Sequence, residues 1–179
     1  RPAAFCGVTG FKPTFGAIPR RGVLMQSPSL DTIGVFAADP TGTALLAEVL
    51  FGHDASDPAT TPTPFPRLSQ TALSKPPVKP DFAMAEGEAV LARDYLAALD
   101  WKPVLNAALG EIFERCDAIL CPAAPGPAPR DVETTGDPVF NGLWTFCGLP
   151  AITLPLLTAS NGMPMGVQLV GADGNDARL

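Results

Sequence analysis

Few side chains in this sequence could do covalent chemistry. The 179 residues include one histidine, His53, so a Ser-His-Asp or Cys-His site built from this chain alone would have to use it. His53 lies in the segment Gly-His-Asp-Ala-Ser-Asp-Pro, whose composition is typical of a turn after a helix. We expect its imidazole to be solvated or bonded to a helix end, and not catalytic.

The four cysteines offer thiols for a nucleophile, a disulfide or a metal site. They lie in or beside apolar runs, and their spacing matches no zinc-ligand pattern. The four positions are Cys6, Cys116, Cys121 and Cys147. We expect buried free thiols here, and we predict no metal site.

Three charged residues near the start of the chain are candidates for a binding or structural role. Arg20 and Arg21 could attract an acidic substrate, although surface charges are the interpretation we favour. Asp31 lies in Ser-Leu-Asp-Thr-Ile-Gly, where a carboxylate can accept backbone hydrogen bonds in a turn. Nothing in the sequence assigns Asp31 a chemical role.

The first seventeen residues have the most distinctive composition of the chain, and their glycines and prolines indicate constrained backbone turns. Gly7, Gly10 and Gly16 permit positive φ or close approach of another backbone. Pro2 and Pro13 fix φ on either side of a short apolar run. The pattern predicts a tightly packed strand with a turn at each end.

Three stretches carry a resemblance in the same order along the chain. The first is R-P-A-A-F-C-G-V-T-G-F-K-P-T-F-G, followed by G-V-L-M-Q-S-P-S-L-D-T-I-G-V-F-A. The second is D-A-I-L-C-P-A-A-P-G-P-A-P. The third is T-G-D-P-V-F-N-G-L-W-T-F-C-G-L-P-A-I-T-L-P with N-G-M-P-M-G-V-Q-L-V-G. Over residues 1–60 and 85–179 the chain resembles the amidase signature family, and in particular its bacterial small-amide hydrolases.

The resemblance implies an α/β fold in which a mixed β-sheet is flanked by helices, present here in part. Family members hydrolyse an amide carbon-nitrogen bond with a Ser nucleophile, a bridging Ser in a cis peptide and a Lys. All three match positions upstream of Arg1, so no catalytic residue is assigned to this chain, and the chain alone is expected to be inactive. Arg1 matches the Arg after the nucleophile, which can bind a substrate carboxylate or hold the nucleophile loop through backbone carbonyls.

The likeness also implies an internally shortened domain. We expect residues 1–179 to form one partial amidase domain in three parts: a segment following the nucleophile (1–60), a proline-rich connector (61–85) and a C-terminal part (86–179). The family has further elements where this sequence passes from the connector into a helix, so we place the shortening in the connector. A long connector without elements of its own is unusual inside a compact domain.

Composition limits the partners. A hydrophobic fraction of 46% with only 17% charged residues indicates a globular chain. A net charge of −6 without a basic stripe argues against direct nucleic-acid binding, and no apolar run is long enough to span a membrane. With no targeting segment in view we expect a cytoplasmic protein without a cofactor that acts on a small-molecule amide. The sequence is also compatible with a homo-oligomer.

Two helices are predicted with cap signals. Asp39 and Pro40 begin one that should end at Gly52. Its expected core-facing residues are Leu45, Leu46, Val49 and Leu50. The pair Asp137-Pro138 begins another, stopped by Gly148 and Pro150, with apolar positions at Phe140, Leu143, Trp144 and Cys147.

Residues 86–115 predict one long helix or two, because Pro103 should kink or break it. Its two expected apolar stripes are Leu91, Tyr95 and Leu99, then Leu105, Leu109 and Ile112. A buried strand over 116–122 should lead into the stiff loop 123–129, which faces the substrate cleft by resemblance or is a rigid surface loop. Antiparallel strands are predicted over 151–157 and 165–170, and the start of a helix over 171–179.

Two further functions stay open. An A subunit-like relative of the glutamine-dependent amidotransferases that act on misacylated tRNA would share the same signature and would need partner subunits. A noncatalytic domain that keeps part of the fold would expose unpaired strand edges and should self-associate. The run F-G-H-D-A-S-D-P-A-T favours the small-amide hydrolase over the amidotransferase.

Overall fold

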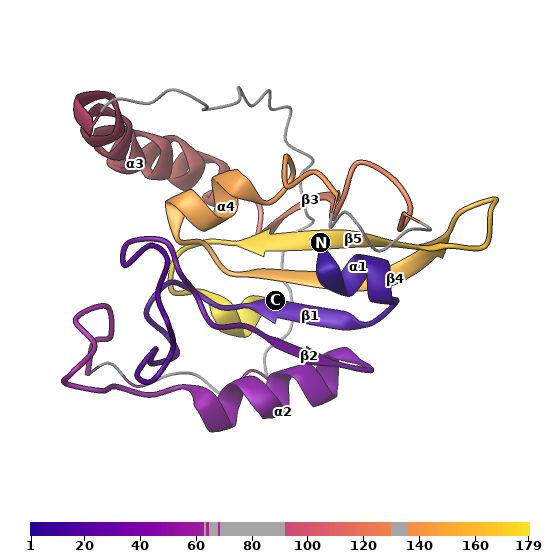
Figure 1. Ribbon diagram of the computed structural model, residues 1–179, viewed down its shortest axis with the longest axis horizontal. Helices are drawn as coiled ribbons and strands as arrows, with labels where there is room; N and C mark the ends of the chain where they lie inside the picture. Colours follow the sequence, from indigo (N-terminus) through magenta and orange to yellow (C-terminus); the bar gives the residue numbers. More distant parts are fainter. Residues whose placement is uncertain (63, 65–67, 69–91, 130–135) are drawn as a thin grey trace.

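The structure is a computed structural model that describes residues 1–62, 64, 68, 92–129 and 136–179. One five-stranded sheet runs through it in the order β2-β1-β4-β5-β3 (Figure 1). The strands are β1 (Thr9–Lys12), β2 (Val35–Ala37), β3 (Ala118–Pro122), β4 (Ala151–Thr158) and β5 (Pro164–Gly171). The helices are α1 (Pro2–Cys6), α2 (Pro40–Leu50), α3 (Ala92–Phe113) and α4 (Gly142–Cys147), followed by the 3₁₀ turn η2 (Asp176–Arg178).

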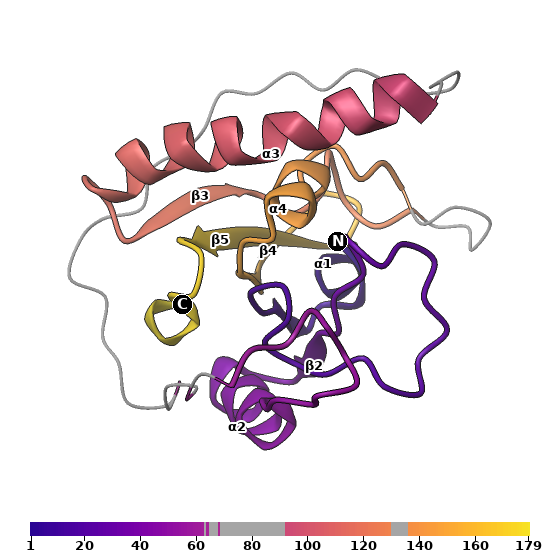
Figure 2. The same cartoon turned by 90° about the vertical axis from the view of Figure 1, so that its left-hand side faces the viewer.

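All pairings of the described strands are antiparallel, whereas the sequence predicted a mixed sheet. The α/β arrangement with helices flanking the sheet is confirmed. Figure 2 shows α3 and β3 at one end of the molecule and α2 at the other, with α1 and η2 on opposite sides of the sheet.

Side-chain alternation divides the core between the two faces of the sheet. On one face Phe11, Val35 and Ile152 pack with Ala47 of α2. On the other face α3 and α4 cover a cluster drawn from β3, β4 and β5. Its buried members are Leu109, Ile119, Cys121, Trp144, Cys147, Leu149, Ala151 and Val170. The helix α1 contacts β1, β4 and β5 on this second face.

The opening residues differ from the predicted strand. Pro2 starts the short helix α1 and Gly7, at φ 65°, ends it, so only Thr9–Lys12 is extended. The prediction failed because proline at a first helical position and glycine at a left-handed C-cap fit a helical turn as well as they fit a strand's flanking turns. The close approach expected at Gly10 is present: a Cβ there would lie 2.6 Å from the Cβ of Ala3.

The α2 cap is confirmed and its packing face is not. Asp39 Oδ1 accepts a hydrogen bond of 2.8 Å from the Gly42 amide. The helix buries Thr43 and Ala47, because these small residues let it approach the sheet closely. The predicted core residues Leu45, Leu46, Val49 and Leu50 are exposed. The helix also ends at Leu50, with Phe51 and not Gly52 as the C-cap.

The long helix α3 is not broken at Pro103, which lies inside it. The second predicted stripe is confirmed, since Leu105, Leu109 and Ile112 pack in the core. In the first stripe Tyr95 is exposed, and Leu91 lies outside the described residues, as do the expected start at Glu86 and most of the connector 61–85. Neither α3 nor any other helix of the described ranges combines the length and hydropathy needed to cross a membrane.

The last third of the chain largely follows the prediction. The helix α4 ends at Gly148, whose φ is 81°, as expected. It begins later than expected, because Asp137 accepts the Val139 amide in a turn and Asn141 takes the N-cap position. The β4–β5 hairpin with its turn at Gly162 is confirmed. Where the start of a helix was predicted over 171–179, Gly171 ends β5 and the residues after it contribute only the short turn η2.

Candidate functional site

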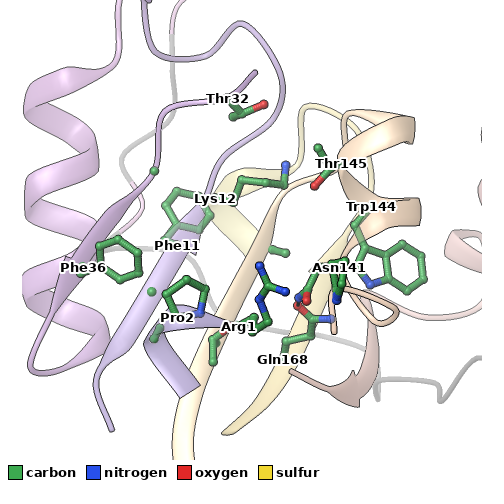
Figure 3. Close-up of a pocket in the computed structure, with 16 residues that line it drawn as sticks. Arg1, Pro2, Phe11, Lys12, Thr32, Phe36, Asn141, Trp144, Thr145 and Gln168 are labelled. Atoms are coloured by element: carbon green, nitrogen blue, oxygen red, sulfur yellow. Dashed lines mark hydrogen bonds between the residues drawn. The ribbon is translucent and has the colours of Figure 1, made fainter. Parts of the chain in front are cut away.

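A pocket of about 370 Å³ opens on the sheet face that carries α1 and α4. Three groups of residues line its sides. Arg1 and Pro2 form the first side, and Asn141, Trp144 and Thr145 form the second. Thr32, Gly34 and Phe36, in and before β2, line a third side. Figure 3 shows Arg1 and Lys12 pointing into the space between these walls.

Strand register builds the floor of this pocket. Gly10 on β1 faces Thr153 on β4, which faces Gln168 on β5. Two residues further along β1, Lys12 faces Ala151. Because residues two apart on a strand share a face, these five positions lie on the pocket side of the sheet, and each of them lines the pocket.

Two cations line the pocket. The Arg1 guanidinium donates a hydrogen bond to the Gly136 carbonyl, and the Lys12 ammonium donates one of 3.0 Å to the Pro13 carbonyl. Among the described lining residues no aspartate or glutamate is present. The pocket is therefore a cationic site with largely apolar walls.

The environment of Lys12 lowers its pKa to about 8, chiefly because burial disfavours the charged form. The nearby carboxylates of Asp176 and Asp173 oppose this shift, and the Lys102 ammonium adds to it. The ammonium of Lys12 is therefore still charged at neutral pH, although its proton is held more weakly than that of an exposed lysine.

A side-chain amide network lies between α4 and β5. Gln168 Nε2 donates to the carbonyl oxygens of Phe140 at 2.6 Å and Pro122 at 3.3 Å, which fixes the orientation of its amide. Gln168 Oε1 then accepts from Asn141 Nδ2 at 3.2 Å. This leaves Asn141 Oδ1 buried with no acceptor bond among the described residues. The network holds the first turn of α4 against the pocket floor.

Arg1, the one site residue the sequence predicted, does line the pocket. Its bond to a backbone carbonyl matches the loop-holding alternative, and its other N–H donors leave room for a ligand as well. Lys12, Asn141 and Gln168 were missed. Each lies inside a motif that carried the resemblance, and their polar side chains within apolar runs were the available signal.

The favoured surface placement is wrong for Arg20 and right for Arg21. Arg20 is buried and paired with Asp57, while Arg21 is 77% exposed. Asp31 accepts backbone bonds from Gln26 at 2.6 Å and Ser27 at 3.0 Å, as its turn motif predicts.

The histidine and the thiols do not enter this pocket. His53 is exposed and its Nδ1 lies 2.9 Å from Thr60 Oγ1, within the loop after α2. All four cysteines are free, but only three of them are buried. Cys6, the last residue of the short α1, is exposed. The loop 123–129 contributes no lining residue, and the described ranges contain no cluster of three His, Cys, Asp or Glu that could hold a metal ion.

Sequence comparison identifies relatives of the whole chain. The family model described as Amidase matches residues 1–80 and 76–179. The chain is 25% identical, over an alignment of 286 residues, to the Glutamyl-tRNA(Gln) amidotransferase "A" polypeptide of Thermosynechococcus vestitus, covering 100% of this chain and 59% of that protein. The polypeptide of the same description from Methanothermobacter thermautotrophicus is 51% identical over 59 residues, 33% of this chain and 13% of that one. The chain spans somewhat more than half the length of the curated relatives that it matches over nearly all its own length.

Solved structures share the fold. The corresponding Glutamyl-tRNA(Gln) amidotransferase polypeptide of Thermotoga maritima superposes with a TM-score of 0.78 at 21% identity, over 99% of this chain and 57% of that one. An inhibitor-bound vestigial protein complex, described as revealing the origins of an s-triazine catabolic enzyme, gives 0.84 at 22%, over 98% and 57%. A 6-aminohexanoate cyclic dimer hydrolase complexed with substrate gives 0.77 at 20%, over 98% and 59%. Because the family model accounts for every residue and the folds agree, this chain belongs to the Amidase family, as its motifs predicted.

Proposed function

We propose that this chain is the substrate-binding part of an enzyme that hydrolyses amide carbon-nitrogen bonds. The observation that carries the proposal is the family match over residues 1–80 and 76–179. The cationic pocket lined by Arg1 supports it. By the family resemblance, Arg1 follows closely on the position of the nucleophile.

In the proposed reaction a neutral Lys draws a proton through the bridging Ser, and the nucleophilic Ser attacks the amide carbonyl. Backbone N–H groups stabilise the oxyanion, ammonia or an amine leaves, and water releases the acid. Those three side chains are supplied from outside this chain. The chain's own contribution is the pocket, where Arg1 holds a carboxylate of the substrate and the sheet floor excludes water.

We also propose the internal shortening that the sequence predicted. The alignment with the Thermosynechococcus vestitus relative runs over 286 residues although this chain has 179, so that relative contains a long stretch without a counterpart here. The two family-model matches meet at residues 76–80, inside the connector. Pocket shape in the enzyme would differ accordingly from that of its longer relatives.

A fluorophosphonate probe tests the proposal, since it labels an activated serine covalently. The chain alone should stay unlabelled. A fusion that joins it to the upstream segment of a relative, with its Ser and Lys, should be labelled, and replacement of that Ser by Ala in the fusion should abolish labelling. A folded fusion that never reacts would overturn the proposal.

One observation favours a second function. The curated relatives quoted above are described as components of a glutamyl-tRNA(Gln) amidotransferase, so a role as such a component is the alternative. It requires partner subunits, which affinity purification of the tagged chain from its source would recover. Recovery of the chain without any partner would remove this alternative.

A further inference from the structure

We infer that the outward face of α2 is a docking surface for the polypeptide that supplies the reacting Ser and Lys. This role rests on the proposed function, and it names the place on this chain where that polypeptide packs. The pocket is lined by residues of other segments and by none from α2, so the docking surface is separate from the binding site.

The helix α2 is apolar on its outward side as well as on the side that faces the sheet. Toward the sheet it buries the small residues Thr43 and Ala47. Its outward side carries four large aliphatic residues at helical spacing. They are Leu45, Leu46, Val49 and Leu50, which are 54%, 47%, 83% and 44% exposed. Glu48 is the only charged residue in the helix, whereas a helix at a protein surface ordinarily carries charged residues on its outward side.

Such a stripe is unusual on a surface that stays in water. Single exposed leucines are common in folded proteins, but adjacent large aliphatic side chains on one helix form a continuous apolar patch. Packing of another apolar surface on this patch is favourable, because it removes the aliphatic side chains from water. The composition of α2 therefore fits a helix that is covered on both sides.

The lengths of the relatives indicate what covers it. The Thermotoga maritima structure and the 6-aminohexanoate cyclic dimer hydrolase structure match nearly all of this chain, but the matches use only 57% and 59% of those chains. The rest of each relative packs around the part that is shared. By the family resemblance, the reacting Ser and Lys lie in that remainder, so it is the polypeptide that we assign to α2.

A second copy of this chain fits the outward face of α2 less well. The helix has 11 residues and is therefore about 16 Å long. Two such faces in contact bury far less than the roughly 1,200 Å² of a stable interface. Each copy also carries a net charge of −6, which opposes close approach of two copies. A longer partner polypeptide can bury α2 together with the surface around it.

The reactivity of a cysteine placed on α2 tests the inference. Cys6→Ser first removes the exposed thiol, and the other three thiols are buried. In that background, Val49→Cys reports on α2, and Ser160→Cys in the exposed turn between β4 and β5 is the control. In the chain alone both should react with a maleimide at similar rates at every protein concentration. In the fusion with the upstream segment, Val49→Cys should react about tenfold or more slowly, and Ser160→Cys at an unchanged rate.

Co-purification provides a second test that does not depend on the fusion. The upstream segment of the Thermotoga maritima relative, tagged and co-expressed as a separate polypeptide, should retain this chain. Val49→Gln should lower the recovery about tenfold, because it places a polar amide in an apolar contact. Leu156→Gln changes a residue of β4 that is 65% exposed and should leave the recovery unchanged. Circular dichroism of the two variants alone should match that of the unchanged chain, since both positions are exposed.

Several outcomes would overturn the inference. They are equal reactivity of Val49→Cys in the chain and in the fusion, no recovery of the chain by the segment, and equal recovery of Val49→Gln. Protection of Val49→Cys in the chain alone would also overturn it. Protection that grows with concentration would show that a second copy covers α2, and protection at all concentrations would show that the chain's own connector does.

The same fusion separates this inference from the proposed function. A fusion that reacts with fluorophosphonate while Val49→Cys stays fully reactive would overturn the docking role and leave the proposed function intact. A fusion that protects Val49→Cys and never reacts with fluorophosphonate would overturn the proposed function and leave the docking contact in place.

Discussion

Arg20 and Asp57 form a bidentate ion pair inside the fold. Arg20 Nη2 lies 2.8 Å from Asp57 Oδ1 and Arg20 Nε lies 3.1 Å from Oδ2, with the two residues only 4% and 6% exposed. The hydrogen bond from Arg20 holds the pKa of Asp57 well below its usual range. The pair ties the segment after β1 to the loop after α2. The next residue, Arg21, is 77% exposed and lies 4.0 Å from Asp54.

This difference predicts unequal effects of the same substitution at adjacent positions. Arg20→Gln should lower the free energy of unfolding by about 3 kcal/mol, because it leaves the Asp57 carboxylate buried without its partner. Arg21→Gln should change it by less than about 0.5 kcal/mol, since exposed pairs contribute little. Urea unfolding followed by circular dichroism measures both. Equal effects of the two variants would contradict the buried pair.

The sequence could not distinguish the two arginines. The two arginines are adjacent in one polar turn, and the carboxylate that pairs with Arg20 lies 37 residues away in the sequence. The α2 helix shows the same limit of prediction. Its N-cap could be predicted from Asp39, but its buried face depends on which side of the helix approaches the sheet. Small Thr43 and Ala47 permit that approach, and hydrophobic spacing pointed to the leucines instead.

Two substitutions on α2 test this orientation. Ala47 is fully buried, so Ala47→Leu should overpack the contact with Phe11 and Ile152 and cost about 1 to 3 kcal/mol. Val49 is 83% exposed, and Val49→Ala should stay within about 0.5 kcal/mol. Thermal and urea unfolding of both variants check the prediction. A larger loss of unfolding free energy for Val49→Ala than for Ala47→Leu would support the buried face of α2 that the sequence predicted.

Burial of Lys12 predicts a stability change at alkaline pH. Its pKa is about 8 in the folded chain, against 10.5 ordinarily, so between these values the unfolded chain binds a proton that the folded chain does not. The free energy of unfolding should therefore rise as pH increases from 8 to 10.5. Lys12→Gln should lose that part of the slope, and Arg21→Gln should keep it. Identical slopes in all three proteins would contradict the burial of Lys12.

The sheet edges predict self-association. The strand β2 spans only three residues at one edge and β3 lies at the other, with no further strand paired to either among the described residues. Phe36 on β2 is 57% exposed. We expect concentration-dependent dimers or larger species in sedimentation velocity, because unpaired edges and exposed apolar side chains favour association. A clean monomer at all concentrations would argue against edge pairing, and against the noncatalytic self-associating domain as well.

The site could be predicted from sequence only in part. Motif likeness placed Arg1 beside the reacting groups, and the structure puts Arg1 at the pocket wall. The contributions of Lys12 and Gln168 required the sheet register, which brings residues 156 positions apart onto one floor. When a single polar residue lies inside an apolar run, the sequence alone does not show which face of the sheet its side chain occupies, because strand pairing decides this.

Ammonia release from simple amides is the most direct test of the central claim, that this chain contributes the binding pocket while the reacting Ser and Lys come from elsewhere. Purified chain should release no ammonia from propionamide or succinamate above the uncatalysed rate. The fusion that supplies the upstream segment should release it, and faster from succinamate. Steady ammonia release by the chain alone would contradict the account.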